Sequence, residues 1–266
     1  MERRARDIIR QTAVISSAGF MLVAALFGSG VFGHDAVSEQ QNGSLSDQGS
    51  YLAPAGPAFS IWSVIYLGLI VYVIWQALPG QRDDERQRAA GWWIAASMVL
   101  NGLWLVAARF GPFWSTVLVI VLLLVVLARV MILLGRASPS SFAQRVLLDG
   151  VNGLHFGWVT IATVANTAAW LTSIAPDAWG RQADIWGVGV LVAVAVICSA
   201  SAWVLRRIVP ALASAWGLVW LAVGRFTDEP RSTVIGVTAI VVAGVIVLVA
   251  AVAALRRSRR GAAVRR

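Results

Sequence analysis

Long apolar runs constrain this chain more than any other feature. The hydrocarbon core of a bilayer is about 30 Å thick and a helix rises about 1.5 Å per residue, so a crossing helix needs about 20 mostly apolar residues. Eight runs approach or exceed that length, at residues 13–33, 59–78, 92–108, 113–134, 148–172, 186–205, 209–224 and 234–255. They are too long for the strands of a membrane barrel and lack their alternation. The sequence therefore predicts an all-α integral membrane protein with about eight transmembrane helices.

The placement of the arginines predicts how these helices are oriented. Only 13% of residues are charged, against about a quarter in soluble domains. If the N-terminus is cytoplasmic, most arginines fall on inner segments. The predicted outer segments hold only Arg109, Arg181, Arg225 and Arg231. By the positive-inside rule we expect a multi-pass protein of the cell membrane, taken to be a bacterial plasma membrane, with both termini cytoplasmic.

The net charge of +9 is interpreted as this orientation signal together with contact with the anionic head groups of membrane lipids. We therefore expect membrane lipids as partners and no nucleic acid. The first apolar run could also be a cleaved signal peptide, but it is long and lacks a clean small-x-small cleavage site, so a retained helix is favoured.

Breaks between the runs suggest an organisation in two parts. The polar stretch 34–50 predicts an outer loop, partly flexible, and the break at 175–185 separates five helices from three. We predict a five-helix membrane bundle at 1–174, a connecting loop at 175–185, a three-helix membrane extension at 186–255 and a basic cytoplasmic tail at 256–266. Small residues in the last three helices permit close helix approach, for packing or for a homodimer.

Amide side chains inside the apolar runs are candidates for a functional site. An amide in hydrocarbon is costly unless it is hydrogen-bonded, so Asn101, Asn152 and Asn166 should face the interior of the bundle. Two uses remain open, which are bonding between helices and lining a ligand cavity.

Two ionisable residues share the fifth run with these amides. Asp149 is predicted to cap its helix or to pair with Arg129 or Arg145. His155 has three open uses: a hydrogen bond to a neighbouring helix, which is favoured, proton transfer, and ligation of an iron porphyrin, which ranks last. Ion-driven transport is disfavoured because so few ionisable groups lie in the membrane.

Conventional catalytic and metal motifs are missing from the sequence. It holds no paired carboxylate site, no Gly-rich phosphate loop after a strand and no nucleophile elbow. The lone Cys198 can form neither an intrachain disulfide nor a multi-thiolate metal site. We therefore predict no catalytic residues and no metal ligands.

Three segments carry a family resemblance. FSIWSVIYLGLIVYVIW at 59–75 resembles a Trp-x-x-x-Tyr segment through Trp62 and Tyr66, and LNGLW at 100–104 resembles an Asn-x-x-Trp segment. WVTIATVANTAAW at 158–170 matches a Trp, Ala, Asn and Trp in order. Over roughly residues 13–173 the chain resembles the TspO/MBR family of tryptophan-rich sensory proteins, relatives of the mitochondrial translocator protein, also known as the peripheral benzodiazepine receptor.

The resemblance implies a five-helix bundle whose cavity binds porphyrins. A flat apolar macrocycle needs aromatic faces for stacking, a small residue that leaves space and one or two amides for orientation. No cofactor is required, and porphyrin or haem would be a ligand. The predicted ligand-binding residues are Trp62, Tyr66, Asn101, Trp104, His155, Trp158, Ala162 and Asn166.

The implied function is a membrane receptor or carrier for a small hydrophobic aromatic ligand, a porphyrin or other tetrapyrrole, with a sensory or regulatory role. Two alternatives are a membrane enzyme that degrades porphyrin photo-oxidatively and a small-molecule transporter with a different substrate. The chain departs from the family pattern, because the Pro-Pro-Gly-Trp entry to the second helix is replaced by residues 54–58. Only Trp158 of the two cavity tryptophans tied to degradation is matched, which weakens the enzymatic alternative.

Overall fold

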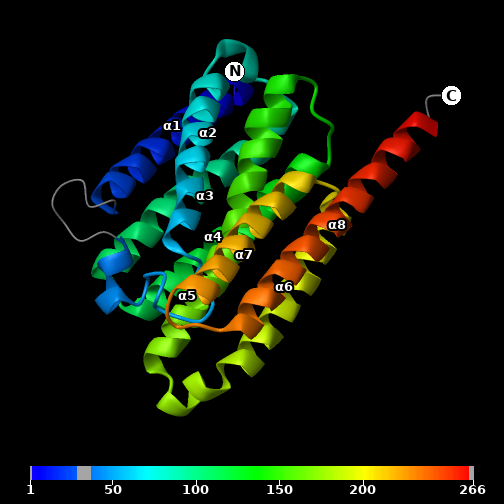
Figure 1. The fold of residues 1–266 in the computed structure, drawn as a ribbon. Helices are drawn as coiled ribbons and strands as arrows, with labels where there is room; N and C mark the ends of the chain where they lie inside the picture. The colour runs from blue at the N-terminus through cyan, green and yellow to red at the C-terminus, as the bar shows by residue number, and fades with distance from the viewer. Residues whose placement is uncertain (1, 29–36, 264–266) are drawn as a thin grey trace.

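A computed structural model describes residues 2–28 and 37–263 (Figure 1). The start of the predicted outer loop, with His34, and the end of the predicted tail lie outside the described residues. The long helices are α1 (Glu2–Gly28), α2 (Ile61–Gln76), α3 (Glu85–Phe110), α4 (Phe113–Gly135), α5 (Val151–Ile174), α6 (Ala183–Leu205), α7 (Ile208–Thr227) and α8 (Thr233–Ala263). Short helical turns are η1 (Val37–Glu39), η2 (Gln41–Gly43), η3 (Gly56–Ser60), η4 (Pro79–Gln81), the π-helical η5 (Gln144–Gly150) and η6 (Asp177–Gln182).

The prediction of an all-α membrane protein is confirmed. Each of the eight apolar runs overlaps one long helix, and the described residues form no strand. The main difference lies at two helix ends. α1 begins at Glu2, ahead of the apolar run, and α8 continues into the predicted tail as far as Ala263. Arg and Ala favour helix, so a helix extends past the apolar residues that mark the bilayer.

Among the described residues, seven helical stretches are long and apolar enough to cross a membrane. They are α1, the stretch Gly56–Ala77 that contains α2, α3, α4, the stretch Trp179–Leu205 that contains α6, α7, and α8 as far as Arg256. α5 is as long, but Asn152, His155 and Asn166 make it more polar. All three side chains are buried, and α5 packs against α2, α4 and α7. α5 thus lies inside the bundle, where its polar groups do not face lipid.

Successive long helices alternate in direction, so both described ends of the chain lie at one end of the bundle (Figure 1). One apolar core is formed mainly by α1–α5, around Met21, Leu69 and Trp158, and a second mainly by α5–α8, around Leu191 and Leu218. α5 and α7 contribute to both cores. The predicted boundary between two parts of the chain after residue 174 stays a prediction. Helices on either side of this boundary, such as α5 and α7, pack closely against each other.

α5 and α7 cross with their backbones touching. A Cβ atom on Gly157 would lie 2.1 Å from the carbonyl oxygen of Pro210 and 2.8 Å from Cβ of Ala213. The hydroxyl of Ser214 donates a hydrogen bond of 3.0 Å to the carbonyl oxygen of Gly157. Small residues of α7 are therefore used for packing within the chain, as small residues commonly are between membrane helices. A homodimer stays a prediction.

Asp149 joins several helices at the end of the bundle that holds the termini. Its carboxylate forms ion pairs with Arg86 of α3 and with Arg207, which precedes α7. Both arginines also donate to the carbonyl oxygen of Leu134, at 3.0 and 2.8 Å. The predicted pairing with Arg129 or Arg145 is wrong, because the partners come from helices that are distant in the sequence. Arg129 instead lies over the ring of Trp93.

We predict that Gly157→Ala destabilises the protein, because its Cβ would overlap backbone that cannot move alone. Overpacking of this kind costs about 1–3 kcal/mol, which lowers the melting temperature by roughly 2–10 °C in a chain of this size. Thermal unfolding in detergent checks this. Gly189→Ala in α6 is the control, since its Cβ would meet nothing within 4 Å. Equal melting temperatures for the two variants would show that α5 and α7 are not in backbone contact.

We also predict that Asp149→Asn is strongly destabilising. It leaves Arg86 and Arg207, whose side chains are 6% and 11% exposed, without a counter-charge. Breaking a buried ion pair in this way costs about 3–5 kcal/mol. Glu229→Gln is the control, since its ion pair with Arg231 is exposed and should contribute little. If both variants melt at the wild-type temperature, Asp149 does not hold these helices together.

Candidate functional site

A cavity lies at the end of the bundle opposite the termini. Its larger part has a volume of about 530 Å³ between α1, α2 and α3, and a smaller part of about 60 Å³ continues between α3, α4 and α5. Both parts are lined by Val37, Leu45, Phe59, Trp62, Asn101 and Trp104, so we treat them as one and call it the aromatic cavity. The larger part alone falls in the range of about 300–1,000 Å³ typical of small-molecule sites.

Aromatic rings form one wall of the aromatic cavity. Trp62 stacks on Tyr66, one turn further along α2, with ring centroids 5.4 Å apart and planes at 24°. Trp158 of α5 meets Trp62 edge to face at 6.2 Å, and Phe59 meets Trp158 in the same way at 5.7 Å. Trp158 is fully buried and Trp62 is partly buried. The wall thus offers apolar ring surface to a ligand and is held by its own ring contacts.

Two amides lie in the same cavity and also join helices. The hydroxyl of Tyr66 donates to Oδ1 of Asn101 at 3.0 Å. Nε1 of Trp104 donates to Oδ1 of Asn166 at 2.8 Å, and Nδ2 of Asn166 donates to the hydroxyl of Thr116 at 2.8 Å. The prediction that the amides face the interior is confirmed, since Asn101 is 2% and Asn166 is 4% exposed. The two amides thus bond helices to one another and also line the cavity, and a ligand at the cavity stays a prediction.

One face of α5 supplies small side chains to the cavity. Ala162, Ala165 and Ala169 line it beside Trp158 and Asn166. Their spacing of three and four residues puts them on one side of the helix. Seven predicted ligand residues, all except His155, therefore lie together around one cavity.

His155 lies behind the cavity wall. It lines neither part of the cavity, is fully buried, and meets the ring of Trp62 edge to face at 5.8 Å. Within the described part of the chain, neither ring nitrogen has a hydrogen-bond partner. The favoured expectation of a bond to a neighbouring helix is therefore wrong. Asn152 is similar, since its amide nitrogen bonds only to the carbonyl oxygen of Leu148 in the preceding turn.

The segment 44–59, which we call the roof segment, lines the cavity and was missed as part of the site. Its contributions include Leu45, Asp47, Pro54 and Phe59. Its centre is packed rather than exposed, with Leu52 fully buried and Ala55 3% exposed. The mostly apolar stretch 51–59, which includes two prolines, was the one signal in the sequence that this part of the chain enters the protein.

α7 and the turn that follows it hold the roof segment in place. The backbone N–H of Ala55 donates to the carbonyl oxygen of Trp220 at 3.1 Å, and Nε1 of Trp216 donates to the carbonyl oxygen of Ala58 at 2.9 Å. Arg225, only 1% exposed, donates to the carbonyl oxygens of Asp47 and Pro230. The three C-terminal helices, to which the sequence assigned only a packing or dimerisation role, thus position one wall of the cavity.

We predict that Arg225→Gln loosens the roof segment, because the shorter neutral side chain cannot reach both carbonyl groups. Hydrogen–deuterium exchange should become faster at Ala55 and its neighbours, while helix α4 keeps its protection. Arg231→Gln is the control, because that side chain is exposed and binds only nearby groups. Unchanged exchange at Ala55 in Arg225→Gln would mean that other contacts hold the roof segment.

Comparisons with known proteins agree with this architecture. A search of curated proteins and a search of solved structures found no match to the chain. A family model described as TSPO-like protein matches residues 12–252, a range that begins within α1 and ends within α8. Because the match covers most of the chain, this protein belongs to the TSPO-like family.

Proposed function

We propose that this protein is a membrane receptor or carrier that binds a flat apolar aromatic molecule, a porphyrin or other tetrapyrrole, in the aromatic cavity. The observation that carries the proposal is the convergence of Trp62, Trp104 and Trp158 with two interhelical amides around one cavity. Ring surfaces favour stacking of a flat macrocycle, and the few polar groups would fix its orientation.

Asn101 supplies a polar group that a ligand can use. Its Oδ1 accepts from Tyr66, while its Nδ2 forms no hydrogen bond within the described residues. Asn101 lines both parts of the cavity. A donor on the cavity lining that has no partner among the described residues favours ligands that bring an acceptor.

A binding role is favoured over catalysis by the chemistry of the lining. Asp47 and Tyr66 are the ionisable side chains on the described cavity wall, and no nucleophile beside a base lies there. A regulatory output is favoured because the roof segment is bonded to α7, so an occupant that shifts the roof would also shift the C-terminal helices. A ligand can move that equilibrium only by the difference in its affinity for the two states.

Titration of protoporphyrin IX into purified protein, followed by its absorbance and by tryptophan quenching, tests the proposal. We expect Ala162→Phe to weaken binding by roughly tenfold or more, because the ring fills the smaller part of the cavity. Trp62→Leu should weaken it by roughly three- to tenfold through lost stacking of about 0.5–1.5 kcal/mol. The matched controls are Ala193→Phe and Trp203→Leu, both on exposed positions of α6, which should bind like the wild type.

Affinity unchanged in both cavity variants would place the binding site elsewhere. The same samples separate binding from degradation. After illumination in air, the bound porphyrin should keep its absorption spectrum. New absorption bands that appear with the wild type but not when Trp158 is replaced would instead support the alternative of a porphyrin-degrading enzyme.

A further inference from the structure

A second polar site lies at the opposite end of the bundle, where α1 packs along α3. Arg3, Arg6 and Arg10 follow at spacings of three and four residues and share one face of α1. Arg88 and Trp92, four residues apart, share the facing side of α3. Together with Asp7 these residues line a pocket of about 330 Å³, which we call the arginine pocket.

The arginine pocket has an excess of positive charge. The carboxylate of Asp7 is engaged by Arg88, whose Nη2 lies 2.6 Å from Oδ2 and whose Nε lies 3.0 Å from Oδ1. The guanidinium of Arg10 lies 3.9 Å from the same carboxylate. The lining of the pocket therefore holds one carboxylate and four guanidinium groups, which is an excess of positive charge that an anion would offset.

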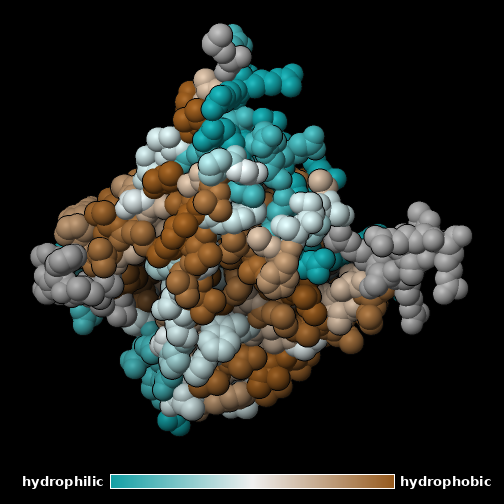
Figure 2. All heavy atoms as spheres, turned by 90° about the horizontal axis from the view of Figure 1, so that it is seen from above, coloured by the Kyte–Doolittle hydropathy of each residue, from teal (hydrophilic) through white to brown (hydrophobic). Residues whose placement is uncertain are grey.

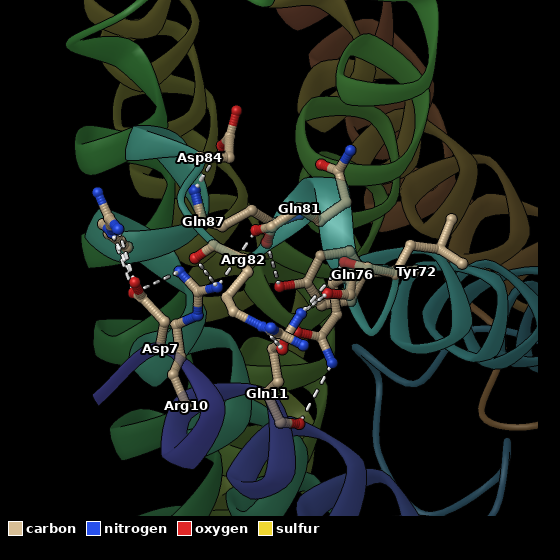
Figure 3. A network of polar contacts seen from close by, with 11 residues as sticks. Asp7, Arg10, Gln11, Tyr72, Gln76, Gln81, Arg82, Asp84 and Gln87 are labelled. Atoms are coloured by element: carbon tan, nitrogen blue, oxygen red, sulfur yellow. Dashed lines mark hydrogen bonds and ion pairs between the residues drawn. The ribbon is translucent and has the colours of Figure 1, made fainter. Parts of the chain in front are cut away.

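Arg10 is held at the base of this pocket. It is 1% exposed, and its Nη2 donates to the carbonyl oxygens of Gln81 and Arg82 in the α2–α3 connection, at 3.3 and 3.0 Å (Figure 3). Its Nε and Nη1 have no hydrogen-bond partner within the described residues. A buried cation with unused donors is costly unless an anion offsets its charge, and the nearby carboxylate of Asp7 is shared with Arg88.

The backbone makes room for this cation. A Cβ atom on Gly91 of α3 would lie 2.8 Å from Cδ and 3.2 Å from Cγ of Arg10. The lack of a side chain at position 91 thus lets the stem of Arg10 lie against α3. The guanidinium of Arg10 is therefore positioned by the packing of α1 against α3, unlike that of an arginine side chain at the surface.

Apolar surface adjoins the arginine pocket. Trp92, which lines the pocket, is 47% exposed. Seen from the end that holds the termini, hydrophilic residues gather over one part of the molecule and hydrophobic residues lie over neighbouring parts (Figure 2). An occupant with a charged head and apolar chains would match both surfaces.

We propose that the arginine pocket binds the phosphate of an anionic phospholipid, with the acyl chains lying on the apolar surface beside it. Guanidinium groups suit phosphate because their N–H donors form paired, charge-assisted hydrogen bonds with its oxygens. The half-exposed Trp92 suits the interface between head groups and acyl chains.

Native mass spectrometry of the full chain in detergent, titrated with phosphatidylglycerol or with phosphatidylcholine, tests the proposal. Phosphatidylglycerol should bind more tightly, and the double variant Arg3→Gln, Arg6→Gln should weaken it by roughly tenfold or more, since each basic residue near an anionic lipid contributes on the order of 1 kcal/mol. The matched control is Arg136→Gln, Arg145→Gln, which removes two exposed arginines from the same end of the bundle. It should bind phosphatidylglycerol like the wild type.

Three outcomes would overturn the proposal. If the two double variants lose affinity for phosphatidylglycerol equally, the lipid is attracted by the net charge of the protein alone and not by this pocket. Equal affinity for the two lipids would mean that the anionic head group is not recognised. Inorganic phosphate that binds the wild type and displaces phosphatidylglycerol would make free phosphate the occupant. The exposed positions of Arg3 and Arg6 mean that folding, checked by melting temperature, should be unaffected.

Discussion

The burial of α5 is the constraint on which the rest of the structure depends. Polar side chains in hydrocarbon are costly, and α5 carries Asn152, His155 and Asn166 within one membrane-length helix. The helix therefore lies among α2, α4 and α7 instead of facing lipid. One of its faces forms part of the aromatic cavity and another contacts the backbone of α7 at Gly157. The position of the cavity and the packing of α5 against α7 thus both follow from the need to bury the polar side chains of α5.

This arrangement gives the C-terminal helices a place in the site. α7 touches α5 directly and also holds the roof segment through Trp216, Trp220 and Arg225. A five-helix bundle alone would leave the roof segment without these partners. The cavity is therefore best regarded as a product of the whole chain, in agreement with a family match that extends through residue 252.

Local patterns were enough to predict the helices and the burial of the amides, whereas the aromatic residues of the cavity wall were predicted from the family resemblance. Apolar runs located every long helix, and the cost of buried amides placed Asn101 and Asn166 in the interior. Pairings between distant segments could not be predicted from one sequence. Asp149 pairs with Arg86 and Arg207, whereas reasoning from neighbours favoured Arg129 and Arg145. The prediction for His155 failed for a related reason. Its ring packs against Trp62, a contact with another helix that does not involve a hydrogen bond to its ring nitrogens.

The most direct measurement of the central claim is an experimental structure of the protein with protoporphyrin IX bound. The account predicts a macrocycle in the aromatic cavity, within stacking distance of Trp62 or Trp104 and beside the face of α5 that carries Ala162. A macrocycle found instead in the pocket between α5 and α6, against Trp179 and Trp186, would contradict it.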